Sequence, residues 1–391
     1  MFPGLTALPA VLGTAMVILA GSCGTTKVGQ LLSWRPVVTI GLISYSVYLW
    51  HWPLIVFSKF YGINLVDGLS RNQSQAMLFV SSLLLGYLSW RFVEQPFRSS
   101  SGRFGRSSIY GLTFTFMAGF AGFAAYLVHS NGAEFRFSER ARAIASHTVG
   151  SPEQYRTGQC FMASKTSTLA DFDQSHCLPA PDGRPRLLVV GDSHAAALWW
   201  GFKEALPGVN VMQATASGCK PVTEQLPRQH QHCVRLIDFT YRDYLVKNKV
   251  DLVVIAARWR AGDLPGLTAT LAWLKSIGVQ ALVVGPIAQY DSPLPRLLAY
   301  AVETGDANYA KHHLLREVQP LDEKMRAQAS SQWQVPYVSL YSIVCPEGKC
   351  KEYVAQDMPL YTDYGHLNKL GSEWAARRIL SANIVQLINK K

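Results

Sequence analysis

The sequence lacks two features that would point to other kinds of protein. It has no Cys-x-x-Cys pair with histidines nearby, so its 7 cysteines do not match the ligand pattern of a zinc site. It also has no typical signal peptide, because no basic residue precedes the first apolar run and no small-residue cleavage site follows it. We therefore expect no metal site, and we expect the first apolar run to be something other than a cleaved leader.

Acidic residues are scarce. Asp and Glu number 26 against 37 Lys and Arg, which gives a net charge of +11. The basic excess is scattered along the chain rather than gathered into a run. This distribution argues against nucleic acid as a partner, whereas a basic domain outside the cell would suit an anionic polysaccharide or lipid headgroup.

Four long apolar runs are confined to the first 130 residues. They are Phe2 to Ala20, Val37 to Phe57, Ala76 to Phe92 and Ile109 to Val128. Each is close to the roughly 20 residues that span a bilayer. A single run could be a buried core helix, but four in succession with short polar connectors predict four membrane spans.

Basic residues predict the orientation of these spans. The connector between the third and fourth runs carries Arg98, Arg103 and Arg106. Its one acid is Glu94, so the arginines mark that side as cytoplasmic. By alternation, everything after Val128 lies outside. We expect a multi-pass protein of the cytoplasmic membrane whose C-terminal domain lies in the periplasm or otherwise outside the cytoplasm.

Six cysteines lie in the C-terminal part, and an even number suits disulfide bonds. They are Cys160, Cys177, Cys219, Cys233, Cys345 and Cys350. The simplest connectivity joins neighbours in the sequence, 160 to 177, 219 to 233 and 345 to 350, although the spacing leaves the other pairings open. Disulfides indicate an oxidising compartment, which agrees with the predicted orientation.

The C-terminal part, residues 153–391, alternates short aliphatic runs with longer amphipathic segments. The aliphatic runs are Leu187 to Val190, Val209 to Gln213, Leu252 to Ala256, Ala281 to Val284 and Tyr337 to Leu340. The amphipathic segments are Val234 to Lys247, Leu267 to Ile277 and Tyr309 to Ser330. This alternation predicts a doubly wound, three-layer α/β domain with a parallel sheet and a site at the carboxyl ends of its strands. Residues 130–152 are predicted to be a polar linker or short helix after the membrane segment, residues 1–129.

The first aliphatic run leads directly into the motif GDSH, Gly191 to His194, and then into a segment suited to a helix. A serine at a strand-to-helix turn projects its hydroxyl at the edge of the sheet, near helix N–H groups that favour negative charge. On the motif alone, a turn with serine as a helix cap is the alternative. The position after the first buried strand favours Ser193 as a nucleophile, with His194 structural or lining the substrate.

A serine nucleophile needs a base, and the base needs an orienting carboxylate. Of the 10 histidines, only His366 has a carboxylate at short spacing in a loop between the last predicted strand and the final helix. The block runs Asp363-Tyr364-Gly365-His366. We therefore predict that Ser193, His366 and Asp363 form a catalytic triad.

The two motifs resemble the first and last blocks of SGNH hydrolases and transferases. The resemblance implies an SGNH-hydrolase-like domain with backbone donors to an oxyanion, one of them Ser193 and another Gly218, in ATASGCKP. The usual Gly-x-Asn-Asp block is absent, because Ala256-Ala257-Arg258-Trp259 stands in its place. The third donor is then Arg258 or Trp259, or the hole has two donors; a structural ion pair is the other reading of Arg258.

The membrane segment also resembles a known family. The stretch LLSWRPVVTIGLISYSVYLWHWPLIVF, residues 31–57, and RFVEQPFR, residues 91–98, are similar to the closing part of the acyltransferase-3 family, bacterial membrane proteins that move acyl groups onto extracytoplasmic sugars. In one branch an extra span leads to an SGNH domain. The resemblance implies a missing upstream portion that takes an acyl group from acetyl-CoA, with no cofactor bound in this chain. A start outside the membrane without a leader agrees with a chain that is the tail of a longer protein.

His51 is a candidate site residue within the membrane. An ionisable group inside a span usually faces a cavity or a partner and serves function. The flanking Trp50 and Trp52 favour the alternative, a place in the aromatic belt at the outer interface. Both readings remain open.

Three functions are consistent with these features. The leading one is a membrane-bound O-acyltransferase, for which we expect acetyl transfer, that modifies a cell-surface polysaccharide or lipopolysaccharide through an acyl-serine. The alternative is a membrane-anchored extracytoplasmic carbohydrate esterase. A non-catalytic binding module is the third.

Overall fold

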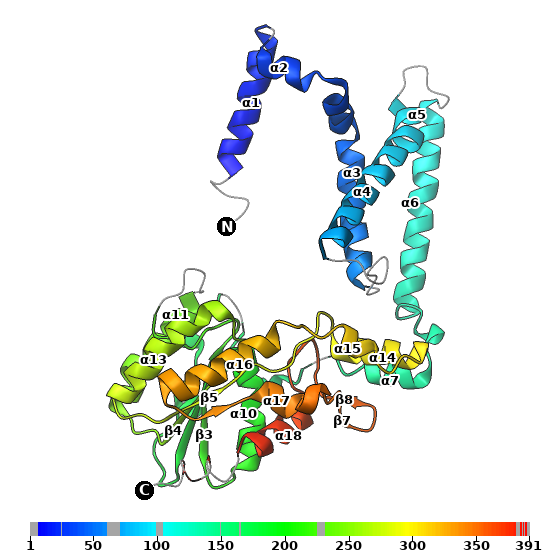
Figure 1. Ribbon diagram of the computed structural model, residues 1–391. Coiled ribbons are helices and arrows are strands. Elements are labelled where there is room, and N and C mark those ends of the chain that lie inside the picture. The colour runs from blue at the N-terminus through cyan, green and yellow to red at the C-terminus, as the bar shows by residue number, and fades with distance from the viewer. Residues whose placement is uncertain are drawn as a thin grey trace. The chain divides into compact units, whose positions relative to one another are not determined.

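The computed structural model describes residues 7–24, 26–60, 71–98, 105–148, 150–163, 166–224 and 231–380, together with 384, 386 and 388. The chain divides into two units, Met1–Gly132 and Ala133–Lys391. The first is helical, and the second combines strands and helices (Figure 1).

The first unit consists of helices. They are α1 (Leu8–Ser22), α2 (Lys27–Leu32), α3 (Arg35–Phe60), α4 (Arg71–Ser89), the π-helical turn Trp90–Glu94, α5 (Gln95–Arg98) and α6 (Arg106–His129). Three stretches are long and apolar enough to cross a membrane: Arg35–Ser58, Asn72–Phe97 and Ser107–His129. The apolar helix α1 has 15 residues, which is short of the roughly 20 that a span needs.

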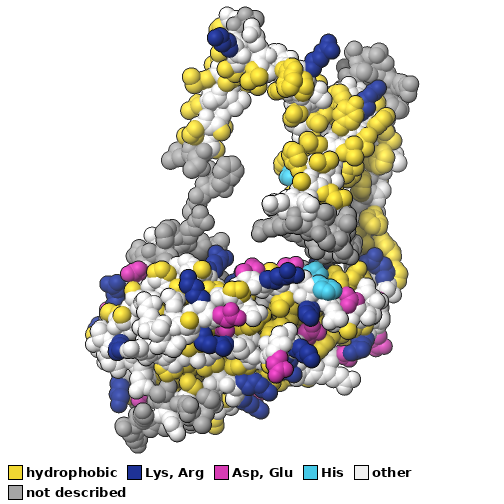
Figure 2. Space-filling view, viewed as in Figure 1, with side chains coloured by type: hydrophobic (Ala, Val, Ile, Leu, Met, Phe, Trp, Pro, Cys, Tyr) yellow, Lys and Arg dark blue, Asp and Glu magenta, His cyan; other side chains and the backbone are white. Residues whose placement is uncertain are grey.

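The structure therefore supports three of the four predicted spans. The predicted first span starts at Phe2, and its residues 2–6 lie outside the described part of the chain, as does Arg103, one of the arginines used for orientation. Large side chains such as Phe79, Phe114 and Phe120 are exposed on the other helices, and Figure 2 shows hydrophobic side chains over much of the visible surface of this unit. Continuous exposed apolar surface of this kind suits lipid rather than water.

Helices α3 and α4 are in close contact within the first unit. A Cβ atom on Gly86 would lie 2.9 Å from the backbone of Val47, so glycine allows the two helices to approach. Ser46 is buried and donates a hydrogen bond to Glu94 at 3.0 Å. Small residues and polar pairs of this kind are typical of contacts between helices in membranes.

The second unit contains a parallel sheet of six strands in the order β1-β3-β2-β4-β5-β6. They are β1 (Phe161–Met162), β2 (Arg186–Gly191), β3 (Asn210–Ala216), β4 (Leu252–Ala256), β5 (Ala281–Val284) and β6 (Tyr337–Val338). A two-stranded antiparallel ribbon, β7 (Tyr353–Ala355) and β8 (Met358–Pro359), is separate from it. The prediction of a parallel sheet is confirmed, and the five aliphatic runs supply β2 to β6.

Helices cover both faces of this sheet. The α-helices of the second unit are α7 (Glu139–Ala145), α8 (Pro152–Tyr155), α9 (Gln174–Cys177), α10 (Ser193–Ala205), α11 (Gln231–Asp238), α12 (Leu245–Lys247), α13 (Leu264–Ser276), α14 (Leu294–Thr304), α15 (Tyr309–His312), α16 (Val318–Gln328), α17 (Leu340–Val344) and α18 (Lys369–Ile379). Figure 1 shows α11 and α13 on one side of the strands and α10 and α18 on the other.

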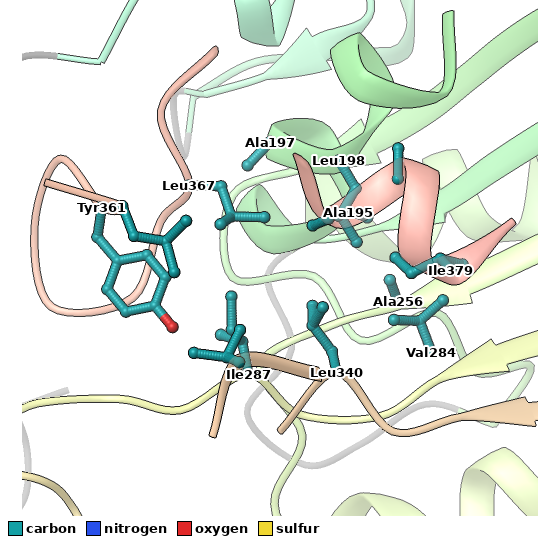
Figure 3. Packing of buried hydrophobic residues seen from close by; sticks show 14 of the residues in the cluster. Ala195, Ala197, Leu198, Ala256, Val284, Ile287, Leu340, Tyr361, Leu367 and Ile379 are labelled. Atoms are coloured by element: carbon teal, nitrogen blue, oxygen red, sulfur yellow. The ribbon is translucent and has the colours of Figure 1, made fainter. Parts of the chain in front are cut away.

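The alternation of side chains along the strands creates two cores. In β2, Leu187 and Val189 join one buried cluster, whereas Leu188 and Val190 join the other. The first cluster includes residues of α10, α14 and α18, and Figure 3 shows Ile379 of α18 close to Val284 and Ala256 of the sheet. A central strand buried on both faces is the reason that its sequence is continuously aliphatic.

Two predicted segments differ in detail. The segment Tyr309 to Ser330 forms two helices rather than one, because the backbone of Leu315 bonds Gln289 at 2.8 Å and Leu314 forms a bridge with Tyr290. The predicted linker contains α7, whose Ile144 is fully buried in the core. Long-range contacts therefore order both places.

The three disulfides join Cys160 to Cys177, Cys219 to Cys233 and Cys345 to Cys350. These are the pairs that the simplest connectivity predicts. The remaining cysteine, Cys23, is free and exposed.

Candidate active site

The turn between β2 and α10 places Ser193 at the carboxyl edge of the sheet. Gly191, the last residue of β2, pairs with Thr215 of β3 on one side and with Ala256 of β4 on the other. A Cβ atom on Gly191 would lie 1.7 Å from the carbonyl oxygen of Ala256, and its φ is 153°. Only glycine fits this turn. It lets the chain leave the middle of the sheet and begin α10 at Ser193.

Ser193, His366 and Asp363 are connected by two hydrogen bonds. The Ser193 hydroxyl lies 2.7 Å from Nε2 of His366, and Nδ1 of His366 lies 2.6 Å from Oδ2 of Asp363. Because an ionised carboxylate only accepts, Nδ1 carries the proton and Nε2 is free to accept from the serine. This is the arrangement that activates a serine nucleophile.

Asp363 is held ionised and in a fixed orientation. Its Oδ1 accepts the backbone N–H groups of Gly365 and His366 at 3.0 and 2.9 Å. Burial raises the pKa of Asp363, but the hydrogen bond and the charge of His366 and these N–H groups together hold that pKa below its ordinary value. The loop thus supplies its own orienting carboxylate within four residues.

His194 packs directly against the proposed base. The two imidazole rings lie 4.5 Å apart, and His194 is 8% exposed. Burial lowers the pKa of His194 well below its ordinary value, and the charges of Arg258 and Lys220, and of His366 when it is protonated, lower it further. His194 is therefore neutral near pH 7, and it lies next to the base, as a structural role would have it.

Arg258 joins three loops at the carboxyl edge of the sheet. Its backbone N–H donates to Asp192 at 2.8 Å, and its Nε donates to Gln289 at 2.9 Å. Its guanidinium carbon lies 4.4 Å from the ring centre of Tyr364. The backbone N–H and Nε are thus committed to protein groups, and the guanidinium also hydrogen-bonds Tyr364. A role for Arg258 as an oxyanion donor remains a prediction.

Trp259 does not supply the missing donor. Its side chain is 3% exposed, and its indole N–H donates to the carbonyl oxygen of Val284 at 2.9 Å. The indole belongs to the core beneath the sheet edge, so this reading of the altered block is wrong.

Gly218 lies in the turn that follows β3, with a left-handed φ of 65°. Thr215, three residues earlier, pairs with Gly191 at the end of β2. The register therefore brings Gly218 to the same edge as Ser193, where its role as an oxyanion donor remains a prediction. The next residue, Cys219, is tied to Cys233 of α11.

His51 lies in α3, in the first unit, where its Nδ1 is 2.6 Å from the carbonyl oxygen of Tyr48 one turn earlier. Its ring also contacts that of Tyr48, with 5.4 Å between centres. One ring nitrogen is therefore satisfied within its own helix. A functional role for His51 remains a prediction.

Sequence reasoning missed several residues around the triad. Tyr364 lies 5.2 Å from the His366 ring and contacts both His194 and Arg258. Gln289 follows β5 and holds Arg258. The position of Tyr364 inside the Asp-x-x-His block was the available signal, whereas nothing in the sequence singles out Gln289.

A serine–histidine–aspartate triad at the carboxyl edge of the parallel sheet of a three-layer α/β domain defines a serine acyl-transfer domain of SGNH type. Residues 159–381 match the family described as the SGNH domain fused to AT3 domains, where AT3 denotes acyltransferase-3. The match covers more than half of the chain, which belongs to this family.

Relatives and solved structures agree with this assignment. The O-acetyltransferase OatA of Staphylococcus aureus is 33% identical over 89 residues, which are 22% of this chain and 14% of that protein. The peptidoglycan O-acetyltransferase OatA of Listeria monocytogenes is 30% identical over 92 residues, 23% of this chain and 14% of the relative. The chain thus matches a small part of the length of these proteins.

The periplasmic domain of a lipopolysaccharide acetyltransferase of Salmonella serovar Paratyphi A has a similar fold. Its TM-score is 0.50 at 19% identity, and the match covers 62% of this chain and 95% of that domain. At this identity the likeness concerns the fold.

Proposed function

We propose that this chain is part of a membrane-bound O-acyltransferase that moves acyl groups, chiefly acetyl, onto hydroxyls of a cell-surface polysaccharide or lipopolysaccharide. The observation that carries the proposal is the hydrogen-bonded chain from the Ser193 hydroxyl through His366 to Asp363. Its position at the end of the central strand leaves the serine partly exposed at the sheet edge. A substrate carbonyl can reach it there.

The reaction we propose has two steps. His366 takes the hydroxyl proton through Nε2 while Ser193 Oγ bonds to the acyl carbon of the donor, and N–H groups of Ser193 and Gly218 stabilise the oxyanion. The donor's leaving group departs with the proton from His366, which leaves an acyl-serine. An acceptor hydroxyl then gives its proton to His366 and takes the acyl group, and Ser193 regains its hydrogen.

The membrane unit supports the choice of transfer over hydrolysis. Three apolar stretches long enough to span a bilayer precede the SGNH domain, and the family is one in which this domain is fused to AT3 domains. We propose a fourth span near the N-terminus, a place in the cytoplasmic membrane with the SGNH domain outside, and an acetyl-CoA-derived acyl group delivered by an AT3 portion. The names of the two relatives mention peptidoglycan and lipopolysaccharide acetyltransferases, which supports a glycan acceptor.

A fluorophosphonate probe and p-nitrophenyl acetate test the nucleophile on the full chain in detergent. We expect Ser193→Ala to abolish covalent labelling and to lower ester turnover by at least about 1,000-fold, because the residual rate of triad variants comes from binding and the oxyanion hole alone. Ser330→Ala, at an exposed serine of the same domain, is the matched control. Equal turnover by Ser193→Ala and the wild type would show that the triad assignment is wrong.

The same preparation distinguishes transfer from hydrolysis. With cell-wall or lipopolysaccharide fragments added, a transferase places acetyl groups on the glycan, as mass spectrometry detects, and releases less free acetate. An esterase releases acetate in the same amount with or without the glycan. Absence of both labelling and turnover would favour a binding module.

A further inference from the structure

Asp192, which directly precedes the nucleophile, is the centre of a buried polar network that the reaction scheme does not use. This residue is 2% exposed. Its Oδ1 accepts the backbone N–H of His194 at 2.9 Å, and its Oδ2 accepts that of Arg258 at 2.8 Å. The side chain therefore caps α10 and also joins the first turn of this helix to the loop after β4.

Lys220 supplies the positive charge of this network. Its ammonium lies 3.9 Å from Oδ2 of Asp192 and 3.2 Å from Oδ2 of Asp263. It also donates a hydrogen bond to the carbonyl oxygen of Arg258. At most 14% of any of the three ionic side chains is exposed, so these charges interact largely without screening by water.

The place of Lys220 in the chain relates the network to the reaction. Lys220 follows Gly218 by two residues and stands next to Cys219, whose disulfide with Cys233 holds the same loop. The acceptors of its ammonium lie on two other segments of the sheet edge, the turn at Asp192 and the loop after β4. One side chain thus joins the three segments that surround the end of β2.

Stability alone does not explain a buried charge here. Apolar side chains of similar volume often replace buried ion pairs without loss of stability. An ammonium can fix the relative positions of several groups, because its three N–H groups point to separate partners. Lys220 meets separate partners in this way, because its ammonium donates a hydrogen bond to the Arg258 carbonyl and forms ion pairs with Asp192 and Asp263.

We propose that Lys220 is a positioning residue, which holds Asp192 and the loops after β3 and β4 so that the N–H groups of Ser193 and Gly218 point at the developing oxyanion. This inference rests on the proposed acyl-transfer function. The partners named above belong to the protein, so Lys220 acts on the reaction through the backbone that it holds.

Lys220→Met and Lys220→Arg, made in the full chain, test the proposal with p-nitrophenyl acetate as substrate. Loss of one oxyanion donor typically costs about 100 to 1,000-fold in kcat. We expect Lys220→Met to lower kcat and kcat/KM by a common factor of about 100, with KM almost unchanged, as for an interaction made only in the transition state. Lys220→Arg, which retains the charge and the donors, should recover at least about tenfold of that loss.

A double-mutant cycle tests whether Lys220 acts through Asp192. In an Asp192→Asn background, Lys220→Met should lower kcat by less than about fivefold, because the carboxylate that it orients is gone. Lys275→Met, at an exposed lysine of α13, is the matched control and should leave kcat unchanged.

Should Lys220→Met fail to fold, Asp263→Asn removes one ionic partner of the same ammonium without altering the triad, and it should lower kcat at constant KM.

The outcomes separate this inference from the proposed function. If Ser193→Ala abolishes labelling but Lys220→Met or Asp263→Asn retains wild-type kcat per folded molecule, the positioning role is overturned and the acyl-transfer function stands. A lower melting temperature without a change in kcat, or an equal effect of Lys220→Met with and without Asp192, would likewise overturn it. If Ser193→Ala remains active, the proposed function fails first.

Discussion

At the scale of single residues, His194 is a buried histidine beside the proposed base. Its imidazole is buried against the ring of His366, with positive charges nearby, and its pKa is lowered well below the ordinary value. In the unfolded chain the same side chain takes up a proton below pH about 6.5. The folded state therefore binds fewer protons than the unfolded state just below this pH.

This difference predicts that stability rises with pH between roughly pH 5 and 6.5, because the unfolded state binds more protons than the folded state over that range. His194 contributes at most about 1.4 kcal/mol per pH unit to the free energy of unfolding. In His194→Asn the rise should be shallower, as denaturant unfolding at several pH values would measure. His312→Asn, at an exposed histidine, serves as the matched substitution; an unchanged slope in His194→Asn would contradict the prediction.

At the scale of elements, the contact between α10 and α18 sets the distance between the segments that carry the nucleophile and its base. A Cβ atom on Gly201 of α10 would lie 2.1 Å from the carbonyl oxygen of Ser372, and the Gly201 N–H donates to the Ser372 hydroxyl at 2.8 Å. Helix α10 begins at Ser193, and α18 begins three residues after His366. The contact therefore fixes the spacing of the two helices that follow the catalytic residues.

Gly201→Ala should separate these helices. Overpacking of a well-packed contact typically costs about 1–3 kcal/mol of stability, and the displacement of α18 should also lower ester turnover. Denaturant unfolding and p-nitrophenyl acetate kinetics measure the two effects. Gly208→Ala, where a new Cβ meets nothing within 4 Å, should change stability by less than about 0.5 kcal/mol; similar behaviour of the two variants would refute the role of the contact.

Elements were predictable where a pattern is local. The continuous aliphatic runs of β2, β4 and β5 indicate strands buried on both faces, and the structure has them as β-strands of one parallel sheet. The break between α15 and α16 was not predictable, because it depends on backbone bonds to residues 289 and 290. Amphipathic periodicity continues through such a break and gives no sign of it.

At the scale of the whole molecule, the apolar helices of the first unit predict how the protein behaves in cell fractionation. Three of its stretches are apolar enough to span a bilayer. We expect the chain to remain in the membrane fraction through washes with high salt and alkaline carbonate, since neither weakens the burial of apolar surface in lipid. Detergent should release it. Release of the chain by salt alone would contradict the presence of spanning helices.

The sequence by itself determined the chemistry of the triad. Gly191 ends a buried strand and Ser193 follows two residues later, and Asp363 precedes His366 by the spacing that lets one loop orient its own histidine. Short-range geometry of this kind is encoded in consecutive residues. The same holds for the apolar length of the spans, although the first of the four is not confirmed.

Only the tertiary structure decided what surrounds the triad. Ser193 and His366 are 173 residues apart in the chain, and the Lys220 ammonium meets Asp192 and the Arg258 carbonyl from another loop. From the sequence, Arg258 could be an oxyanion donor or part of an ion pair. In the structure its backbone N–H donates to Asp192. The physical reason is that parallel strands bring their carboxyl ends together in an order that the sequence does not spell out, and the site forms where those ends meet.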